Sequence, residues 1–241
     1  ENKKVLDIAC GEGYGANLLA TKAAYVTGMD NDETVITQAT IRYKKQNLNF
    51  ITGDAENIVL PEGSYDVVTC FETIEHVTDQ AKMMTAIKKV LKPGGLLIIS
   101  TPNKKTYSDK TGNRNPYHVK ELYEDEFTSL LKQYFRNTKL LKQQTMLASL
   151  ITNNGNNSLT MYEGDYKKIN VAGIPEALYF VTLASDSELP ALNNSLFNGQ
   201  SVYENVLRER ERFVAGTITY KVGHFILYPF KLIRKLFNGK E

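Results

Sequence analysis

Several features that would mark particular classes of protein are scarce or missing in this sequence. It has only two cysteines in 241 residues, Cys10 and Cys70, and their pattern favours reduced structural thiols over disulfides. Its formal net charge is +2, without a long basic stripe, so no binding to DNA is expected. No apolar run approaches the length of a spanning helix, and no signal-peptide pattern opens the sequence. These absences favour a cytoplasmic protein.

What the sequence does contain is an alternation of strand-like and helix-like segments. Strands are predicted over 3–9, 24–30, 48–52, 65–71, 95–101, 138–144 and 178–184, and helices over 15–23, 32–46, 79–91 and 119–135. Apolar strands that alternate with helices are typical of a parallel sheet covered on both faces. The predicted fold class is therefore α/β, a Rossmann-like doubly wound and mostly parallel sheet.

The first predicted strand runs into a loop with three glycines at alternate positions, Gly11, Gly13 and Gly15. Glycine tolerates positive φ and lets the backbone approach a ligand closely, so the loop is suited to holding a small molecule. Dinucleotide-binding loops have a different spacing, G-x-G-x-x-G, which seats a pyrophosphate. Asp7 and Glu12 would repel a pyrophosphate, whereas their carboxylates suit a ligand that carries an ammonium or sulfonium charge.

Two further acids follow the next strands. Asp30 ends the second predicted strand, roughly 20 residues beyond the glycine loop, where a carboxylate can accept hydrogen bonds from both hydroxyls of a ribose. Asp54 follows the third strand and is placed to reach the exocyclic amine of an adenine. The order of strand, glycine loop, ribose acid and base-reading acid predicts a nucleoside-containing ligand.

Taken together, these motifs resemble the class I S-adenosylmethionine (SAM)-dependent methyltransferases, and the resemblance extends through YDVVTCFETIEHV and VLKPGGLLIISTPN. It implies an enzyme that uses SAM as methyl donor, with a sheet that is closed by an antiparallel hairpin. It also implies a set of cofactor-binding residues: Asp7, Ala9, Gly11, Glu12, Gly13, Tyr14, Gly15, Asp30, Asn31, Asp54, Ala55, Glu56, Phe71 and Glu72.

The acceptor side is marked by an E-x-x-E-H motif, Glu72, Glu75 and His76, and by a later histidine, His118. Two carboxylates and an imidazole at this spacing converge on one divalent ion if the segment turns helically. The pattern resembles the metal-dependent branch of this superfamily, which includes the small-RNA 3′-terminal 2′-O-methyltransferases. Its first half also resembles the ubiquinone-pathway O-methyltransferases.

The resemblance implies that Glu72, Glu75, His76 and His118 hold Mg²⁺ or another divalent cation beside the reactive methyl group. A metal-free alternative stays open, in which His76 or His118 is the general base or orients the acceptor. In both interpretations Glu72, His76 and His118 are the candidate catalytic residues.

A long polar loop precedes and includes His118, and it contains Tyr107, Asn113, Arg114, Asn115 and Tyr117. This stretch is similar to bacterial methyltransferases of surface-polysaccharide and other glycan biosynthesis. Aromatic rings stack on sugar faces, and amides and arginine bind hydroxyls or phosphate. The predicted acceptor is therefore a hydroxyl of a sugar or glycan precursor. Two alternatives stay open: a small-molecule O-methyltransferase acting on a quinone-like or RNA 3′-end substrate, and a non-catalytic SAM-binding subunit.

The predicted organisation is a methyltransferase domain over 1–187 and a C-terminal helical extension over 188–241. An Asn- and Gly-containing insert at about 146–176 predicts a loop or small lid over the substrate. In the extension, residues 201–216 carry an apolar stripe opposite alternating charges, which indicates a docking or dimerising helix and hence a homodimer.

The last segment, 221–240, combines an apolar stripe with cations. Such a helix can lie on anionic lipid, which predicts peripheral contact with the inner face of the membrane. Packing of the same stripe against the protein itself is the alternative.

Overall fold

The computed structural model describes residues 1–112, 114–146, 161–164, 168–173, 176–223 and 225–226. The chain divides into two compact units, Glu1–Pro190 and Ala191–Glu241. The first unit contains the sheet and the helices packed on it. In the second unit the longest described element is α5 (Gln200–Gly216), which confirms the helix predicted there.

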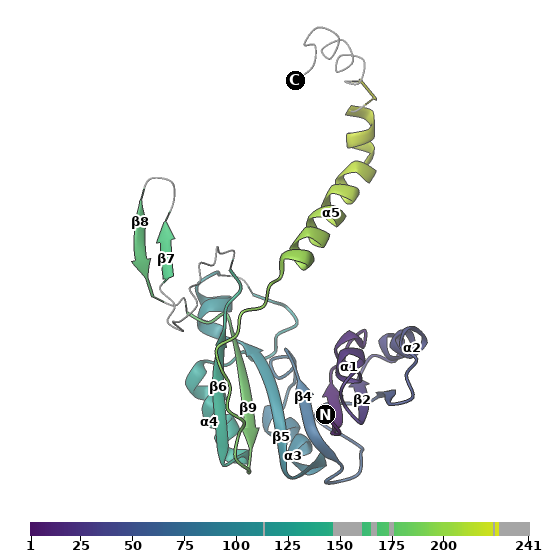
Figure 1. Cartoon of the computed structure of the whole chain (residues 1–241), viewed down its shortest axis with the longest axis vertical. Coiled ribbons are helices and arrows are strands. Elements are labelled where there is room, and N and C mark those ends of the chain that lie inside the picture. Colours follow the sequence, from purple (N-terminus) through teal and green to yellow (C-terminus); the bar gives the residue numbers. More distant parts are fainter. Residues whose placement is uncertain (113, 147–160, 165–167, 174–175, 224, 227–241) are drawn as a thin grey trace. The chain divides into compact units, whose positions relative to one another are not determined.

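Seven strands form one sheet in the order β3-β2-β1-β4-β5-β9-β6. Figure 1 shows the part of this order from β4 through β5 and β9 to β6. The parallel part consists of β1 (Lys4–Ile8), β2 (Tyr25–Asp30), β3 (Leu48–Thr52), β4 (Tyr65–Cys70) and β5 (Leu91–Pro102). The strand β9 (Tyr179–Ser185) runs antiparallel between β5 and β6 (Asn137–Gln143). The predicted α/β class, the parallel sheet and the antiparallel closing pair are confirmed.

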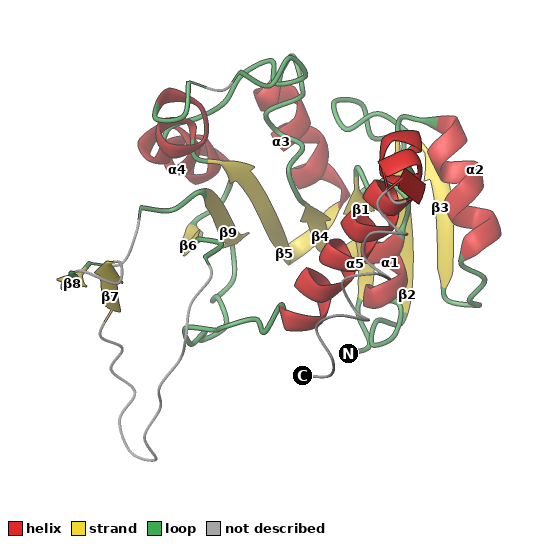
Figure 2. Cartoon of the chain, turned by 90° about the horizontal axis from the view of Figure 1, so that it is seen from above, coloured by secondary structure: helices red, strands yellow, loops and turns green. Residues whose placement is uncertain are grey.

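Both faces of the sheet are covered by helices. On β1, Leu6 and Ile8 belong to the apolar cluster that includes α3 (Gln80–Val90) and α4 (Glu124–Tyr134). Val5 belongs to the cluster on the other face, with α1 (Tyr14–Leu19) and α2 (Glu33–Arg42). Alternate residues of a strand point to opposite faces, so both faces of β1 are apolar, as a buried parallel strand requires. Figure 2 shows α3 and α4 side by side on one face.

Four predicted boundaries are wrong, and the first is that of the helix predicted to reach residue 23, which ends at Leu19. The helix predicted from residue 119 begins at Glu124, where the carboxylate of Glu126 accepts a hydrogen bond from the backbone N–H of Tyr123 (3.0 Å). The helix predicted to reach residue 46 ends at Arg42. The strand predicted to begin at residue 95, β5, begins at Leu91. Gly94 (φ 71°) lies in the irregular part of β5, where the register between β5 and β4 shifts.

The insert contains a second, two-stranded antiparallel sheet, β7 (Met161–Gly164) paired with β8 (Ile169–Ala172). Residues 147–160, 165–167 and 174–175 of the predicted lid, Asn113 of the predicted acceptor loop, and residues 224 and 227–241 in and beside the predicted interfacial helix lie outside the described residues. Within the part of the chain that the structure describes, no helix is long and apolar enough to cross a membrane.

Gly28, in the middle of β2, faces its register partner Phe50 on β3. A Cβ atom at Gly28 would come within 2.6 Å of Cδ1 of Phe50, and the ring is buried, so it has little room to move. We expect Gly28→Ala to lower the free energy of unfolding by about 1–3 kcal/mol, measured by urea denaturation.

Gly173→Ala is the matched control, because no described atom lies within 4 Å of the place where its Cβ would be. Its effect is expected to stay within about 0.5 kcal/mol. Equal stability of the two variants would contradict the tight packing of Gly28.

Candidate active site

The adjacent strands β1 and β4 mark the point where the strand order of the sheet reverses. Open α/β sheets bind ligands at such a point, beyond the carboxyl ends of the strands. Each of these two strands is followed closely by a non-glycine residue with positive φ, Ala9 (53°) after β1 and Glu72 (50°) after β4. This conformation is unfavourable for residues with a Cβ and is concentrated at functional sites. The backbone therefore marks this edge of the sheet as the candidate site.

The glycine loop lies at the end of β1, and its glycines have different roles. Gly13 (φ 79°) precedes α1, and a Cβ there would come within 2.6 Å of the ring of Phe50. Gly11 (φ 52°) has no described atom within 4 Å of its Cβ position, so its backbone is accessible to a ligand. Its N–H donates a hydrogen bond to Oδ2 of Asp30 (2.9 Å), which ties the loop to the end of β2.

Asp7 is a buried carboxylate at the end of β1. Its Oδ1 accepts a hydrogen bond from the hydroxyl of Thr69 (2.7 Å), its register partner on β4. Burial raises the pKa of Asp7 to about 6, although the Thr69 hydrogen bond acts in the opposite direction. A cationic group bound nearby would stabilise the charged carboxylate.

The other predicted cofactor residues fall into two groups. Asp30 and Asp54 follow neighbouring strands, and Asp54 is exposed. Glu12 and Glu56 make contacts within the protein, Glu12 with Arg42 (2.7 Å) and Glu56 with the backbone N–H of Thr78 (2.7 Å).

The remaining predicted cofactor residues line the surface of the same loops. Exposed members are Tyr14, Asn31 and Phe71, and partly buried members are Gly15 and Ala55. The three acids predicted to bind the amine, ribose and adenine of SAM, Asp7, Asp30 and Asp54, thus lie at the ends of three neighbouring strands, and their chemistry fits that cofactor.

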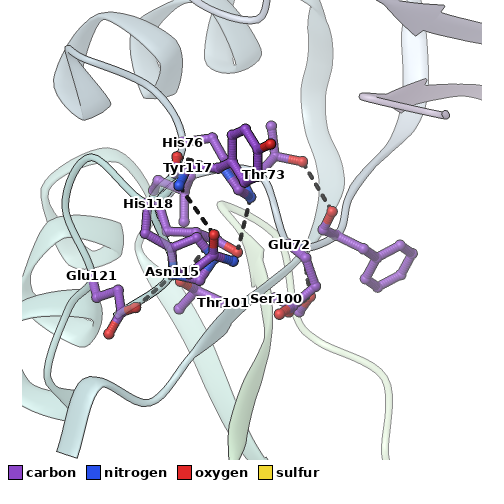
Figure 3. Close-up of polar contacts among 12 residues, drawn as sticks. Glu72, Thr73, His76, Ser100, Thr101, Asn115, Tyr117, His118 and Glu121 are labelled. Carbon is purple, nitrogen blue, oxygen red and sulfur yellow. Dashed lines mark hydrogen bonds and ion pairs between the residues drawn. The ribbon is translucent and has the colours of Figure 1, made fainter. Parts of the chain in front are cut away.

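On the acceptor side, the structure brings Glu75, His76 and His118 together. One ligand atom from each lies within 4.8 Å of the others. Figure 3 shows His76 and His118 on neighbouring segments beside Tyr117. The loop that carries His118 is held there because the backbone N–H groups of Val119 and Lys120 donate to the carbonyl of Glu75 (2.8 and 3.1 Å).

Glu75 is almost fully buried. Its Oε2 accepts a hydrogen bond from the hydroxyl of Thr101 (3.1 Å), and its Oε1 has no hydrogen-bond partner among the described residues. Oε1 lies 3.9 Å from Nε2 of His76. Burial and the nearby charge of Glu72 raise the pKa of Glu75 to about 7. A buried acid without a full set of partners is suited to receive a proton or a cation.

The predicted set of four metal ligands is only partly brought together. Glu72 is not in the cluster of three: its Oε1 accepts a hydrogen bond from Ser100 (2.5 Å), and its backbone N–H donates to the same hydroxyl oxygen (3.1 Å). A residue that the sequence patterns did not single out, Glu121, contacts Nδ1 of His118 (2.5 Å). Glu121 lies three residues after His118, and this spacing is the signal by which the sequence could have identified it.

Known proteins with a similar sequence are methyltransferases. Residues 6–99 match the family model described as a methyltransferase domain. A probable SAM-dependent methyltransferase of Mycolicibacterium smegmatis is 40% identical over 131 residues, which are 54% of this chain and 50% of the relative. A ubiquinone biosynthesis O-methyltransferase of Coxiella burnetii is 37% identical over 106 residues, 43% of this chain and 45% of the relative. The chain spans about half the length of these relatives.

Solved structures share the fold. A putative methyltransferase of Bacillus halodurans superimposes with a TM-score of 0.57 at 15% identity, covering 78% of this chain and 94% of the other. A putative methyltransferase of Haloferax volcanii, in complex with an activator, gives 0.58 at 14% identity, covering 78% and 84%. The strand order defines a Rossmann-like fold. Within that class, residues 6–99 match a methyltransferase domain, and the chain is similar to proteins named as probable SAM-dependent methyltransferases.

Asp30→Ala tests the ribose site. Loss of a charged hydrogen-bond partner is expected to weaken SAM binding by about 1–3 kcal/mol, measured by calorimetry. Asp30→Asn keeps an oxygen that can accept from Gly11 and should weaken binding less. Glu33→Ala, an exposed acid in the first turn of α2, is the control, and an unchanged affinity for Asp30→Ala would remove the ribose assignment.

Asp7→Asn tests the buried acid through pH. Because burial raises the folded-state pKa of Asp7 from 3.8 to about 6, its stabilising contribution is complete below about pH 4 and is lost as the pH rises through 6. We expect Asp7→Asn to raise the melting temperature of the ligand-free protein at pH 7.5 and to have less effect at pH 4.5. The same variant should weaken SAM binding at pH 7.5. A melting-temperature difference that is independent of pH would contradict the buried, titrating carboxylate.

Proposed function

We propose that the protein is an enzyme that transfers the methyl group of SAM to a hydroxyl of a sugar or glycan precursor. The observation that carries the proposal is the convergence of Glu75, His76 and His118 beyond the end of β4, the strand next to β1 and its glycine loop. An acceptor hydroxyl must lose its proton as its oxygen attacks carbon. The cluster gathers three atoms that can take up that proton.

When bound, SAM supplies a methyl carbon on a positively charged sulfur, so the new C–O bond forms as the C–S bond breaks. The residues of the chain then have two tasks. They align the acceptor oxygen with the methyl carbon and the sulfur, and they accept the hydroxyl proton at Nε2 of His76 or His118. Glu75 lies 3.9 Å from His76, where its negative charge stabilises the imidazolium that results.

Aromatic side chains support a ring-shaped acceptor. The ring of Tyr107 stacks on His118 with centroids 5.5 Å apart, and Tyr179 lies 6.0 Å from Tyr107. Asn115 and the exposed Arg114 lie on the same loop as His118 and can bind hydroxyl or phosphate groups. Sugar rings stack on such aromatic faces, and this combination supports a glycan acceptor.

A quinone-like acceptor is the second candidate, and one observation favours it. The relatives include ubiquinone biosynthesis O-methyltransferases at 37% identity, and the rings of Tyr107 and Tyr179 would also stack on a phenolic ring. A phenol is a stronger acid than a sugar hydroxyl, so it needs less help from the cluster to lose its proton.

A divalent cation at Glu75, His76 and His118 is the alternative to proton uptake by a histidine, because an imidazole that binds an ion has no lone pair left for a proton. The ion would lower the pKa of the acceptor hydroxyl. Two imidazoles and one carboxylate suit a borderline ion such as Mn²⁺ or Zn²⁺ better than Mg²⁺, which prefers oxygen ligands. The three ligand atoms spread over as much as 4.8 Å, whereas two ligands at about 2.2 Å from one ion are at most about 4.4 Å apart. Binding would therefore draw the side chains slightly together.

The test uses radiolabelled SAM with a panel of nucleotide sugars, oligosaccharides and catechols. Methyl transfer to a sugar hydroxyl is expected, and Glu75→Gln should lower kcat by about 10²-fold or more without changing the calorimetric affinity for SAM. Glu62→Gln, a surface acid paired with Lys89, is the control. Transfer to catechols alone would replace the glycan proposal by the quinone-like one. SAM binding without transfer to any acceptor would overturn the enzymatic proposal.

The same assay tests the cation. If the ion acts in place of proton uptake by a histidine, treatment with EDTA should abolish transfer, and Mn²⁺ or Zn²⁺ should restore it more effectively than Mg²⁺. Full activity after EDTA treatment would leave the metal-free general-base mechanism in place.

A further inference from the structure

His118 and Glu121 form a buried pair that the proposed chemistry has not yet used. Nδ1 of His118 lies 2.5 Å from Oε1 of Glu121, and the two side chains are only 7% and 8% exposed. Both residues belong to the segment that precedes α4. The pair is therefore shielded from water, where a carboxylate–imidazole contact is strong.

The partners of His118 determine which of its nitrogen atoms carries the proton. A carboxylate can only accept, so Nδ1 of His118 donates to Glu121, and Nε2 is left with a lone pair. The side-chain amide of Asn115 lies 2.9 Å from that Nε2 and donates to it. Both contacts therefore select the same neutral tautomer.

His76 reaches the same tautomer in a different way. Its Nδ1 lies 2.9 Å from the carbonyl oxygen of Tyr117, which also can only accept, so Nε2 of His76 carries the lone pair. The two rings meet edge to face, with centroids 4.8 Å apart. Nε2 of His76 lies 3.9 Å from Oε1 of Glu75, which has no hydrogen-bond partner among the described residues, and His118 completes the cluster of three.

A short π-helix, Lys105–Asp109, fixes the pair from the other side. The hydroxyl of Ser108 donates to Oε1 of Glu121 (2.8 Å), and the ring of Tyr107 stacks on His118. Single turns of π-helix occur frequently at functional sites. The carboxylate and the plane of the imidazole are thus both held in place before any acceptor binds.

We infer that Glu121 is a positioning residue, which holds His118 as the Nδ1–H tautomer, so that Nε2 carries the lone pair that Asn115 occupies until an acceptor hydroxyl takes its place. The inference rests on the proposed function for its chemical consequence. In the other tautomer an N–H bond would occupy that place, and the proton of an acceptor hydroxyl could not be transferred to Nε2. After such a transfer, the carboxylate of Glu121 would stabilise the imidazolium, as the acid of a catalytic triad does.

The tautomer can be observed directly, because the chain has only three histidines, His76, His118 and His224. Protein labelled with ¹⁵N-histidine gives three imidazoles in a long-range ¹H–¹⁵N spectrum, and His76→Gln and His224→Gln variants assign them. In the wild-type protein we expect His118 to show the Nδ1–H pattern. In Glu121→Gln, whose amide can either donate or accept, only the Asn115 contact still selects this tautomer, so the preference should weaken measurably, while the signals of His76 keep their positions.

Activity gives the second measurement. Glu121→Gln should lower kcat by about 10- to 100-fold, the usual loss when the partner of a functional histidine is removed, with the affinity for SAM unchanged. Glu121→Asp keeps a carboxylate and should recover part of both the tautomer preference and the rate. Glu124→Gln, an exposed acid paired with Lys142, is the matched control and should behave as wild type.

An Nε2–H pattern for His118 in the wild-type protein would overturn the inference. So would a Glu121→Gln variant that keeps both the wild-type tautomer and the wild-type kcat. The spectra require neither SAM nor an acceptor, so the positioning role and the proposed function can fail separately. If Glu121→Gln proves unfolded by circular dichroism, the tautomer of His118 in the wild-type protein still decides the inference.

Discussion

The parallel pairing of β1 with β4 is the interaction on which the site depends. It sets Asp7 opposite Thr69 and Ile8 opposite Cys70, so both strands leave the sheet at the same level. Ala9 and Glu72 then turn the chain with positive φ just beyond the ends of these neighbouring strands. The cofactor acids and the acceptor cluster come from segments far apart in sequence, and this pairing is what brings them to one edge.

The site contains two buried carboxyl groups, Asp7 and Glu75, and burial makes the charged form of each unfavourable. Burial raises the pKa of Asp7 to about 6 and that of Glu75 to about 7, and one pKa unit corresponds to about 1.4 kcal/mol between the two protonation states. A folded protein retains such groups when they bind or react, because a ligand or a proton then supplies the missing partner. The two cysteines at the same edge are different: burial raises the pKa of both thiols to about 12, so they are inert packing groups.

Most of the sheet could be predicted from the sequence because buried parallel strands are continuous apolar runs and the turns between them are marked by glycine, proline and aspartate. The start of the last helix of the domain could not. Leu122 has the spacing of a helical core residue, but it pairs with Asn103 in an isolated β-bridge. The neighbouring Val119 and Lys120 donate to the carbonyl of Glu75. The periodic spacing of apolar residues in the sequence gives no sign of such long-range hydrogen bonds.

The sequence by itself determined that an acid-flanked glycine loop follows a buried strand, that further acids end the next strands, and that an E-x-x-E-H motif follows the fourth. These are local facts, because they depend on spacing and on the alternation of side chains along a strand. Only the tertiary structure decided which carboxylates meet the histidines. The positive φ of Glu72 and its hydrogen bonds with Ser100 on β5 keep Glu72 out of the cluster. Glu75 and Glu121 are the carboxylates that lie beside the histidines. The loop of His118 reaches this position because it is hydrogen-bonded to the backbone of Glu75, more than forty residues earlier in the chain.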